Sequence, residues 1–421
     1  AAKIAEERGL DSIVSFDMGG TTAKICLIDH GKPLMARSFE VDRQSRFMKG
    51  SGFPVRIPVI EMVEIGAGGG SIAHIDTMRR IVVGPESAGA EPGPASYGRG
   101  GMQPTVTDAD LALGKISVGR FAGGKIAIHP EKAVAALKSE IGDKIGLDAD
   151  KAAYGVAEII DENMSNAARV HAVERGQAIA ERTMIAFGGA APLHASRMAE
   201  KLGIRTVVVP ADAGVGSAIG FLAAPAAYEM IRSKYLRLDG FDAAAANGLL
   251  DEMSAEATKF AAAAAGARAL TETRSAFMRY SGQGHEIAVT LPTRPLTAAD
   301  AEPLRKAFEA EYSRQFERHI PNAAIEVMSW VVVVSTASAR AERIGAAKGG
   351  AAARASGTQS VFDAGLGRRI EAATYERGDM TAGTRLDGPA LIVEDGTSTY
   401  VSPRFSAAID AGGAIVLTLK S

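Results

Sequence analysis

The sequence predicts an α/β protein whose second half is α+β or rich in strands. Glycine turns follow several of the predicted strands, at the place where open α/β sheets bind their ligands. After about residue 236, Ala-rich helices alternate with strands and no chemical motif stands out. We therefore divide the chain into a first domain of residues 1–235 and a C-terminal domain of residues 236–421. Turn signals separate the first four predicted strands, which are residues 12–17, 23–29, 33–42 and 59–65.

The first two strands are joined by Asp17-Met18-Gly19-Gly20-Thr21-Thr22. Glycine adopts positive φ without a Cβ clash, so the backbone N–H groups of residues 19–22 can converge on anionic oxygens. Asp17, at the strand end, can hold Mg²⁺ or orient a water, directly or through the hydration shell of the ion. No Gly-Lys-Ser/Thr follows, so this is not a Walker loop. The alternative interpretation is an Asp-containing β-turn without chemical significance.

A region rich in Gly and Pro follows, from Gly66 to Gly101, and it contains the run Gly68-Gly69-Gly70. So long an irregular segment is typical of a functional loop. We expect the glycine run to receive a substrate or a partner. The alternative is a surface connector that is rich in helix and strand breakers.

Helical spacing then appears in residues 107–113, 131–140 and 149–176. Asp108 either caps the first of these helices or takes part in catalysis. His171 and Glu174 are three residues apart on the third helix, which can bring two metal ligands together. A packed helix face is the favoured interpretation of that pair, because no third ligand is in reach.

A strand at residues 182–187 opens into the turn Gly188-Gly189-Ala190, and a helix continues to Lys201. His194 lies on this helix and either contacts a nucleotide or caps the helix. A further strand, residues 206–210, leads into a second glycine-bearing turn at residues 213–220.

Composition excludes several partner classes. The formal net charge of −2 and the isoelectric point near 6.5 provide no electrostatic footprint for nucleic acid or an anionic membrane surface. There is no run of 18 or more apolar residues and no signal-peptide pattern in residues 1–10, which predicts a cytoplasmic protein. The single cysteine, Cys26, lies in a predicted strand and indicates a small core residue in a reducing compartment.

These motifs, in this order, resemble the hydantoinase A and 5-oxoprolinase family of the superfamily that includes actin, sugar kinases and heat-shock chaperone ATPases. The resemblance is dense over about residues 10 to 235 and looser beyond. It implies an RNase-H-like ATPase lobe with a mixed sheet and flanking helices. The segments that carry it are residues 16–25, 64–73, 83–98, 104–110, 163–176 and 186–194, with weaker matches at 279–286 and 388–394.

The resemblance also implies site residues. The β- and γ-phosphates of ATP are assigned to Gly19, Gly20, Thr21 and Thr22. Asp17 is assigned to Mg²⁺ or to the nucleophile, so that Asp17 and Thr21 are the predicted catalytic residues. The adenosine is assigned to the turn Gly188-Gly189-Ala190, where a larger side chain would collide with it.

One departure from the family pattern has consequences for the prediction. Family members carry two Asp-x-Gly-Gly-Thr hairpins, one in each lobe, whereas this sequence has one, and it matches the second lobe. We expect the N-terminal lobe to be missing or to reside on another chain. Residues 1–10 read as the last turns of a helix, which fits a cut through a longer polypeptide.

The function implied by the resemblance is that of an ATP-binding subunit or fragment of an ATP-dependent cyclic amide hydrolase. Hydantoinase, N-methylhydantoinase and 5-oxoprolinase activities are of this type, and phosphorylation of the amide oxygen would activate the carbonyl carbon for water. The implied partner is a hydantoinase B-like subunit or domain. One alternative is a subunit of an acetone or acetophenone carboxylase, which phosphorylates an enolate or bicarbonate. Another is a non-catalytic scaffold fragment.

Overall fold

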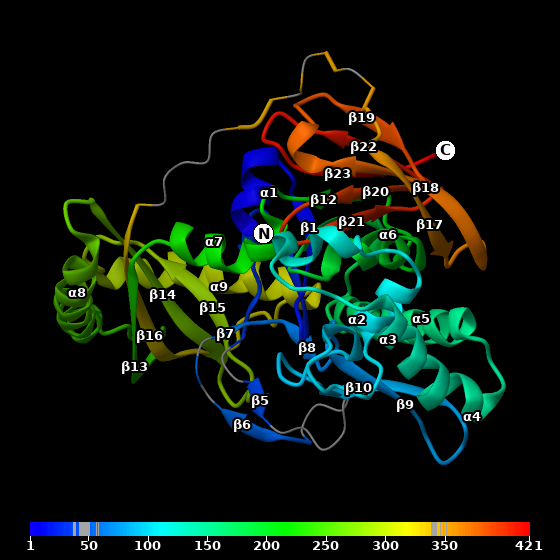
Figure 1. Ribbon diagram of the computed structural model, residues 1–421. Coiled ribbons are helices and arrows are strands. Elements are labelled where there is room, and N and C mark those ends of the chain that lie inside the picture. Colours follow the sequence, from blue (N-terminus) through cyan, green and yellow to red (C-terminus); the bar gives the residue numbers. More distant parts are fainter. Residues whose placement is uncertain are drawn as a thin grey trace. The chain divides into compact units, whose positions relative to one another are not determined.

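The computed structural model describes residues 1–36, 39–41, 51–55, 57, 59–337, 343–345, 347, 349–350 and 352–421. The chain forms two compact units (Figure 1). Unit 1 comprises Ala1–Phe221 and Ala341–Ser421, and unit 2 comprises Leu222–Arg340. The chain therefore leaves unit 1 and returns to it, so these units differ from the predicted division into residues 1–235 and 236–421.

Unit 1 is built on a mixed sheet with nine strands among the described residues, in the order β19-β22-β23-β12-β11-β1-β2-β3, with β8 also paired to β2. Strands β1, β11 and β12 are parallel, and the other pairings are antiparallel. This mixed sheet with flanking helices confirms the predicted fold class. The strands are β1 Ser12–Met18, β2 Ala23–Asp29, β3 Lys32–Pro33, β8 Val63–Ile65, β11 Thr183–Phe187, β12 Thr206–Val209, β19 Arg385–Asp387, β22 Phe405–Ile409 and β23 Ile415–Leu419.

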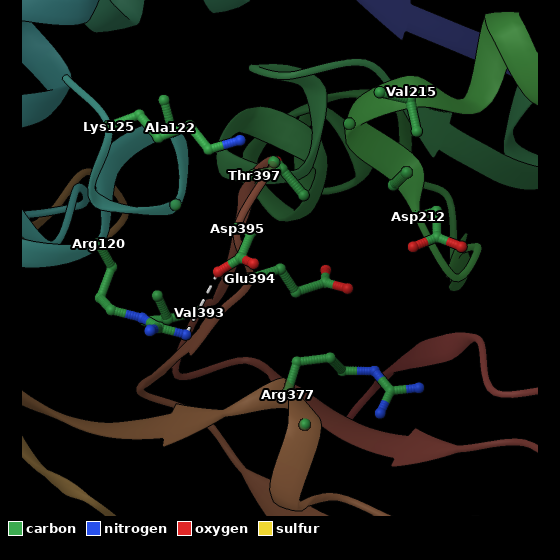
Figure 2. A pocket seen from close by; sticks show the side chains of 15 residues that line it. Arg120, Ala122, Lys125, Asp212, Val215, Arg377, Val393, Glu394, Asp395 and Thr397 are labelled. Atoms are coloured by element: carbon green, nitrogen blue, oxygen red, sulfur yellow. Dashed lines mark ion pairs between the residues drawn. The ribbon is translucent and has the colours of Figure 1, made fainter.

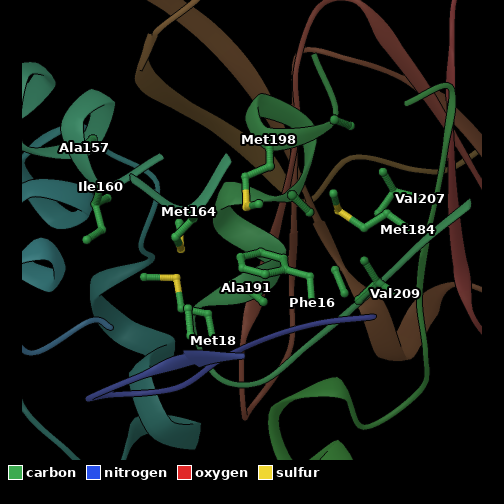
Figure 3. Packing of buried hydrophobic residues seen from close by; sticks show 14 of the residues in the cluster. Phe16, Met18, Ala157, Ile160, Met164, Met184, Ala191, Met198, Val207 and Val209 are labelled. Atoms are coloured by element: carbon green, nitrogen blue, oxygen red, sulfur yellow. The ribbon is translucent and has the colours of Figure 1, made fainter. Parts of the chain in front are cut away.

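The side chains of the central strands alternate between two cores, as the period of two in a strand requires. On one face Phe16 and Met18 pack with Met164 of α5 (Ala149–Val173) and with α6 (Ala191–Leu202), as Figure 3 shows. On the other face Ile13 and Cys26 pack against α1 (Ala2–Arg8). Burial raises the pKa of the Cys26 thiol to about 11, so this residue serves as a small core side chain.

The predicted strands at residues 33–42 and 59–65 are each divided in the structure, because their parts pair with different partners. The segment predicted at residues 33–42 contributes to β3, to β4 (Met35–Ala36) and to β5 (Phe39–Val41). Strand β4 pairs with β7 (Val59–Ile60), and β5 pairs with β6 (Phe53–Val55). Residues 37, 38 and 42 of the first of these predicted strands lie outside the described residues.

The region from Gly66 to Gly101 is less irregular than predicted. It contains an antiparallel hairpin of β9 (Ser71–Ile75) and β10 (Ile81–Ser87). The β-branched residues of this hairpin favour strand, but the surrounding Gly and Pro residues obscure that signal in the sequence.

The remaining elements of unit 1 include the three helices predicted at residues 107–113, 131–140 and 149–176. The structure forms them as α2 (Val106–Ala112), α3 (Pro130–Leu137) and α5. A short π-helical turn, Lys138–Gly142, leads from α3 to α4 (Asp143–Ile145). A second sheet has the order β17-β18-β20-β21. Its strands are β17 Gly357–Asp363, β18 Arg368–Glu376, β20 Ala390–Val393 and β21 Ser398–Val401, and α7 spans Gly216–Ala223.

Unit 2 is an antiparallel sheet of four strands, in the order β13-β16-β14-β15, with two helices packed on it. Its core includes Trp330, Phe308 and Tyr280, and the rings of the last two meet edge to face. This arrangement is the α+β fold predicted for the later part of the chain. The elements are β13 Ala227–Arg237, α8 Ala243–Ala265, β14 Leu270–Tyr280, β15 Ile287–Leu291, α9 Ala301–Phe316 and β16 Ile325–Thr336.

Among the helices that the structure describes, none has the length and apolar character that crossing a membrane would require.

The return of the chain to unit 1 leads to a test with Leu417→Ala. Leu417 is fully buried in β23, which pairs with β12, so we expect the free energy of unfolding of unit 1 to fall by about 2 to 5 kcal/mol. Hydrogen exchange of the Val207 and Val208 amides in β12 measures this loss. Trp330, the one Trp of the sequence, lies in unit 2, and its fluorescence follows that unit separately.

The matched control is Thr418→Ala, the exposed next residue of the same strand, which we expect to change stability by less than about 0.5 kcal/mol. Equal protection of β12 in both variants would contradict the assignment of β23 to the main sheet.

Candidate functional site

The hairpin between β1 and β2 is tight. Met18 pairs with Ala23, and the Gly19 N–H donates to the Thr22 carbonyl at 3.2 Å. Neither Gly19 nor Gly20 adopts the positive φ that the sequence suggested. The space around both glycines is open, because a Cβ added at either residue would meet no heavy atom within 4 Å.

The tip of this hairpin offers backbone donors. Gly20 and Thr21 are exposed, and their N–H groups have no acceptor within the part of the chain that the structure describes. Unpaired N–H groups at an open turn are suited to an anion such as a phosphate. The geometry is therefore compatible with the predicted phosphate site.

The glycine run Gly68-Gly69-Gly70 packs directly on this hairpin. The Gly69 N–H donates to the Gly19 carbonyl at 3.0 Å, and the Gly70 N–H donates to the Gly20 carbonyl at 2.6 Å. A Cβ at Gly68 would lie 2.5 Å from the Thr21 nitrogen, so no side chain fits between the two loops. In this structure the glycine run supports the hairpin through its backbone, and its use by a substrate or partner stays a prediction.

Asp17 lies where the hairpin meets the second glycine turn. Strand β1 is parallel to β11 with Asp17 opposite Phe187, and the Asp17 carboxylate accepts a hydrogen bond from the Ser217 hydroxyl at 2.7 Å. Gly188 follows with a φ of 104°, and a Cβ there would lie 2.6 Å from Asp17 Oδ1. The Ala190 N–H donates to the Met18 carbonyl at 3.0 Å. The structure thus brings together the hairpin and the turn that the sequence singled out separately.

A single carboxylate at this position fits Mg²⁺, which binds proteins through one or two carboxylates and takes its other ligands from water and phosphates. Asp17 is the residue that would hold it. No cluster of three or more His, Cys, Asp or Glu side chains with metal-binding geometry occurs among the residues with a described position.

Asp108 has a structural role in this geometry. It is fully buried, and its carboxylate accepts hydrogen bonds from the backbone of Ala95, Ser96 and Thr105 and from the Thr105 hydroxyl, at 2.8 to 3.0 Å. With Thr105 it forms a capping box at the start of α2. The capping interpretation is therefore the one that the geometry favours over catalysis.

His171 is buried on α5, and Glu174 is the C-cap residue of that helix. Glu174 is exposed, so burial in a packed helix face, the favoured interpretation of the pair, describes His171 and not Glu174.

His194 is fully buried and lies between two carboxylates. Its Nδ1 is 2.7 Å from Asp161 Oδ1 on α5, its Nε2 is 3.1 Å from Asp110 Oδ2 on α2, and Lys115 Nζ lies 3.6 Å from Asp110 Oδ1. Burial lowers the pKa of His194, but the two carboxylates outweigh burial and raise it to about 9. His194 therefore neither caps α6 nor reaches solvent, and it joins α2, α5 and α6 just after the Gly188-Gly189-Ala190 turn.

A pocket of about 570 Å³ opens beside that turn (Figure 2). Parts of residues 120–125, 212–215, 377–378 and 393–397 line it. The Thr397 hydroxyl donates to the Gly189 carbonyl at 3.0 Å, and the Gly188 N–H donates to the Ala213 carbonyl at 2.8 Å. Two residues that line the pocket, Thr397 and Ala213, therefore contact the predicted adenosine turn, which is not itself part of the lining.

Glu394 is the notable acid in this pocket. Burial raises its pKa to about 7, Arg377 opposes this shift and Asp212 adds to it. Its Oε2 is buried and has no hydrogen-bond partner among the described residues. Asp395 and Arg120 form an ion pair at 3.4 Å on another side of the pocket.

Sequence reasoning did not identify Ser217, Glu394 or Thr397 as site residues. A partial signal existed, because the glycine-bearing turn at residues 213–220 and the segment at residues 388–394 were both noted. The connection between β20 and β21 could not be placed against Gly189 without the tertiary structure.

Family models match most of the chain. The hydantoinase/oxoprolinase model matches residues 1–230, and the model of the hydantoinase/oxoprolinase C-terminal domain matches residues 247–418. The two matches leave residues 231–246 between them, and the compact units of the structure have other bounds.

The names of individual relatives refer to several activities. The alpha subunit of caprolactamase from Pseudomonas jessenii is 31% identical over 99% of this chain and 59% of its own length. The beta subunit of acetone carboxylase from Xanthobacter autotrophicus is 27% identical over 97% of this chain and 58% of its own. The 5-oxoprolinase PfmaA of Pestalotiopsis fici is 31% identical over 94% of this chain and 31% of its own.

Two solved structures are similar to this chain over almost its whole length. Nucleotide-free acetone carboxylase superposes with a TM-score of 0.81 at 25% identity, and the ATP-dependent caprolactamase of Pseudomonas jessenii with a TM-score of 0.78 at 29% identity. Each match covers 99% of this chain and 60% of the solved chain. This chain therefore spans about three fifths of the length of these proteins.

The contact between the two glycine loops can be tested with a pair of Gly→Ala variants. We expect Gly68→Ala to lower the free energy of unfolding of unit 1 by about 1 to 3 kcal/mol, because its Cβ would enter the backbone of the hairpin. Gly20→Ala, whose Cβ would point into open space, should change it by less than about 1 kcal/mol. Denaturant unfolding monitored by hydrogen exchange in β1 measures both, and equal losses would contradict the packing described.

The pKa of His194 predicts a pH dependence of stability. Its pKa is raised from 6.5 to about 9 in the folded protein, so its contribution is fully present below pH 6.5 and is lost as the pH rises through 9. We expect the free energy of unfolding of unit 1 to fall as the pH rises through that window. In His194→Gln we expect most of this pH-dependent decrease to be absent. An unchanged slope in the variant would show that other groups cause it.

Proposed function

We propose that this chain, which belongs to the hydantoinase/oxoprolinase family, binds ATP at the β1–β2 hairpin and is the ATP-handling part of an enzyme that opens cyclic amides. Relatives that support this proposal are named caprolactamase and 5-oxoprolinase. The substrate class, the catalytic step and the partner are all part of the proposal, because the chain spans 59% of the caprolactamase subunit it resembles.

One observation carries the proposal, the pairing of Asp17 with Phe187 across the parallel strands β1 and β11. It places the open N–H groups of Gly20 and Thr21, a carboxylate and the turn after β11 at one end of the sheet. A nucleoside triphosphate needs this combination, because it has phosphates to be bound by donors and a nucleoside to be bound nearby. The pocket beside Gly189 is large enough to take part of such a ligand.

The chemistry follows from the stability of an amide. Attack of the amide oxygen on the γ-phosphorus forms an O–P bond and breaks the bond to the leaving ADP. Water can then add to the activated carbon, and the ring C–N bond breaks with proton transfer to nitrogen, which leaves an acyl phosphate. A second water would hydrolyse this acyl phosphate to the carboxylate and inorganic phosphate. Such phosphoryl transfer depends mainly on positioning and charge neutralisation, which the hairpin N–H groups of Gly20 and Thr21 would provide.

Mg²⁺ would neutralise phosphate charge in this site, and Asp17 would hold it directly or through water. Ser217 donates a hydrogen bond to Asp17 and so orients this carboxylate. Thr21, at the exposed tip, is the hydroxyl that we assign to the transferred phosphate.

A second candidate is the corresponding subunit of a ketone carboxylase. It is supported by the TM-score of 0.81 with acetone carboxylase and by the match to the beta subunit of that enzyme. The same hairpin would then position ATP for phosphorylation of an enolate or bicarbonate. A non-catalytic scaffold is the third candidate, and it predicts no nucleotide binding.

Several relatives are named as subunits, alpha in caprolactamase, beta in acetone carboxylase and gamma in acetophenone carboxylase. We propose that this chain also acts with a second subunit or domain of the hydantoinase B type, and in the cytoplasm.

Substrate-stimulated phosphate release by the full protein with its partner separates the candidates. We expect ATP cleavage to be stimulated by hydantoin, 5-oxoproline or caprolactam. Stimulation by acetone or acetophenone with bicarbonate instead would favour the carboxylase. If ATP is neither bound nor cleaved under any of these conditions, the non-catalytic scaffold is the remaining candidate.

The metal and phosphate site can be tested with Asp17→Asn. Loss of the carboxylate charge should weaken Mg²⁺–ATP binding at least about tenfold, because charge-assisted contacts are among the stronger ones in water. Isothermal titration of the chain with ATP in the presence of Mg²⁺ measures the change. The control is Asp11→Asn, an exposed acid just before β1, which should bind ATP as the unaltered chain does.

A further inference from the structure

The pocket beside Gly189 belongs entirely to unit 1, although distant parts of the chain form it. The turn after β12, residues 212–215, supplies one wall, and residues 393–397 between β20 and β21 supply another. These two segments meet at their glycines, since a Cβ at Gly214 would lie 2.5 Å from the Gly396 carbonyl oxygen. The close approach fixes the pocket against the turn that follows β11.

Most basic side chains of this pocket are already engaged. Arg120 pairs with Glu376 at 3.0 Å and with Asp395 at 3.4 Å. The Arg377 guanidinium donates to the Met380 and Gly413 carbonyls. Lys125 has no carboxylate within 4.0 Å among the described residues and remains a donor.

The carboxylate of Glu394, in contrast to these basic side chains, is not fully engaged. One of its carboxylate oxygens is buried without a hydrogen-bond donor among the described residues, and Asp212 is close enough to act on it electrostatically. A buried acceptor without a donor is costly, and a bound ligand that donates would remove this cost. In Figure 2 the Glu394 side chain extends into the space between Asp212 and Arg377.

The charges also decide which part of a nucleotide belongs here. Two neighbouring acids, Glu394 and Asp212, disfavour phosphate groups, which have open N–H donors at the β1–β2 hairpin instead. A nucleoside has hydroxyl and amino donors for a carboxylate and ring nitrogens that accept from a lysine. Its size suits a pocket of about 570 Å³.

We propose that Glu394 accepts hydrogen bonds from the hydroxyl or amino groups of the nucleoside of ATP, which the proposed function already brings to this pocket. This inference rests on the proposed function, since it takes ATP to be the ligand of the hairpin. It assigns a nucleoside-binding residue to the segment between β20 and β21, which sequence reasoning placed in a separate domain.

The test compares ATP with inorganic tripolyphosphate, which has the phosphates but no nucleoside. Both are titrated with Mg²⁺ into the full chain by calorimetry. We expect Glu394→Ala to weaken ATP binding about tenfold or more and to change tripolyphosphate binding less than about twofold. Asp17→Asn should weaken both ligands, because it acts on the shared phosphates.

Two further variants keep the result interpretable. Glu394→Gln retains the shape of the side chain and removes a buried charge, so it should fold, and it should weaken ATP binding selectively but less than Glu394→Ala. Glu371→Ala removes an exposed acid of β18 outside the pocket and should bind both ligands normally.

The pH provides a second readout. Because burial raises the Glu394 pKa to about 7, the fraction of accepting carboxylate in the free protein grows between pH 6 and 8. The ratio of ATP affinities, unaltered chain over Glu394→Gln, should rise over that range, and this ratio cancels the titration of ATP itself.

The outcomes separate the two proposals. ATP binding that is equal in the unaltered chain and in Glu394→Ala would overturn the nucleoside assignment and leave the proposed function standing. Equal losses for ATP and tripolyphosphate would also overturn it, because the variant would then act on the phosphates or on folding. Failure of the unaltered chain to bind either ligand would overturn the proposed function and the inference with it.

Discussion

The parallel pairing of β1 with β11 is the constraint on which the candidate site depends. It sets Asp17 beside Phe187, and the chain must then turn in a space already bounded by the Met18 carbonyl and the Asp17 carboxylate. Gly188 meets this requirement with a φ of 104° that a larger residue adopts only with strain. The hairpin on one strand and the turn on the other are thereby held as one structure.

Other features maintain this arrangement from outside. The run Gly68-Gly69-Gly70 packs on the hairpin through backbone hydrogen bonds. This close approach is possible because these residues have no side chains. On the far side of the turn, His194 ties the first part of α6 to α2 and α5 through Asp110 and Asp161. Because a buried ion cluster that loses one member leaves an uncompensated charge, this tie holds the helices in one arrangement.

Prediction from sequence succeeded where the signal is local. The strands β1, β2 and β11, the helices α2, α3 and α5 and both glycine turns follow from periodicity and turn chemistry. It was less successful where partners are distant: the hairpin β9–β10 was hidden among glycines, and residues 33–42 were divided among several pairings. The burial of His194 between two acids also could not be predicted, because it depends on the packing of three helices and no local sequence pattern indicates which helices pack together.

The sequence by itself determined that residues 17–22 form an open, glycine-containing turn between two strands, since side-chain size and alternation act between neighbours. Only the tertiary structure decided that β23 pairs with β12 in the main sheet, that Thr397 contacts Gly189 and that Glu394 lines the same pocket as Thr397. The physical reason is that strand pairing and pocket formation depend on hydrogen bonds and packing between residues about 200 positions apart, and such contacts leave no periodic trace in either segment.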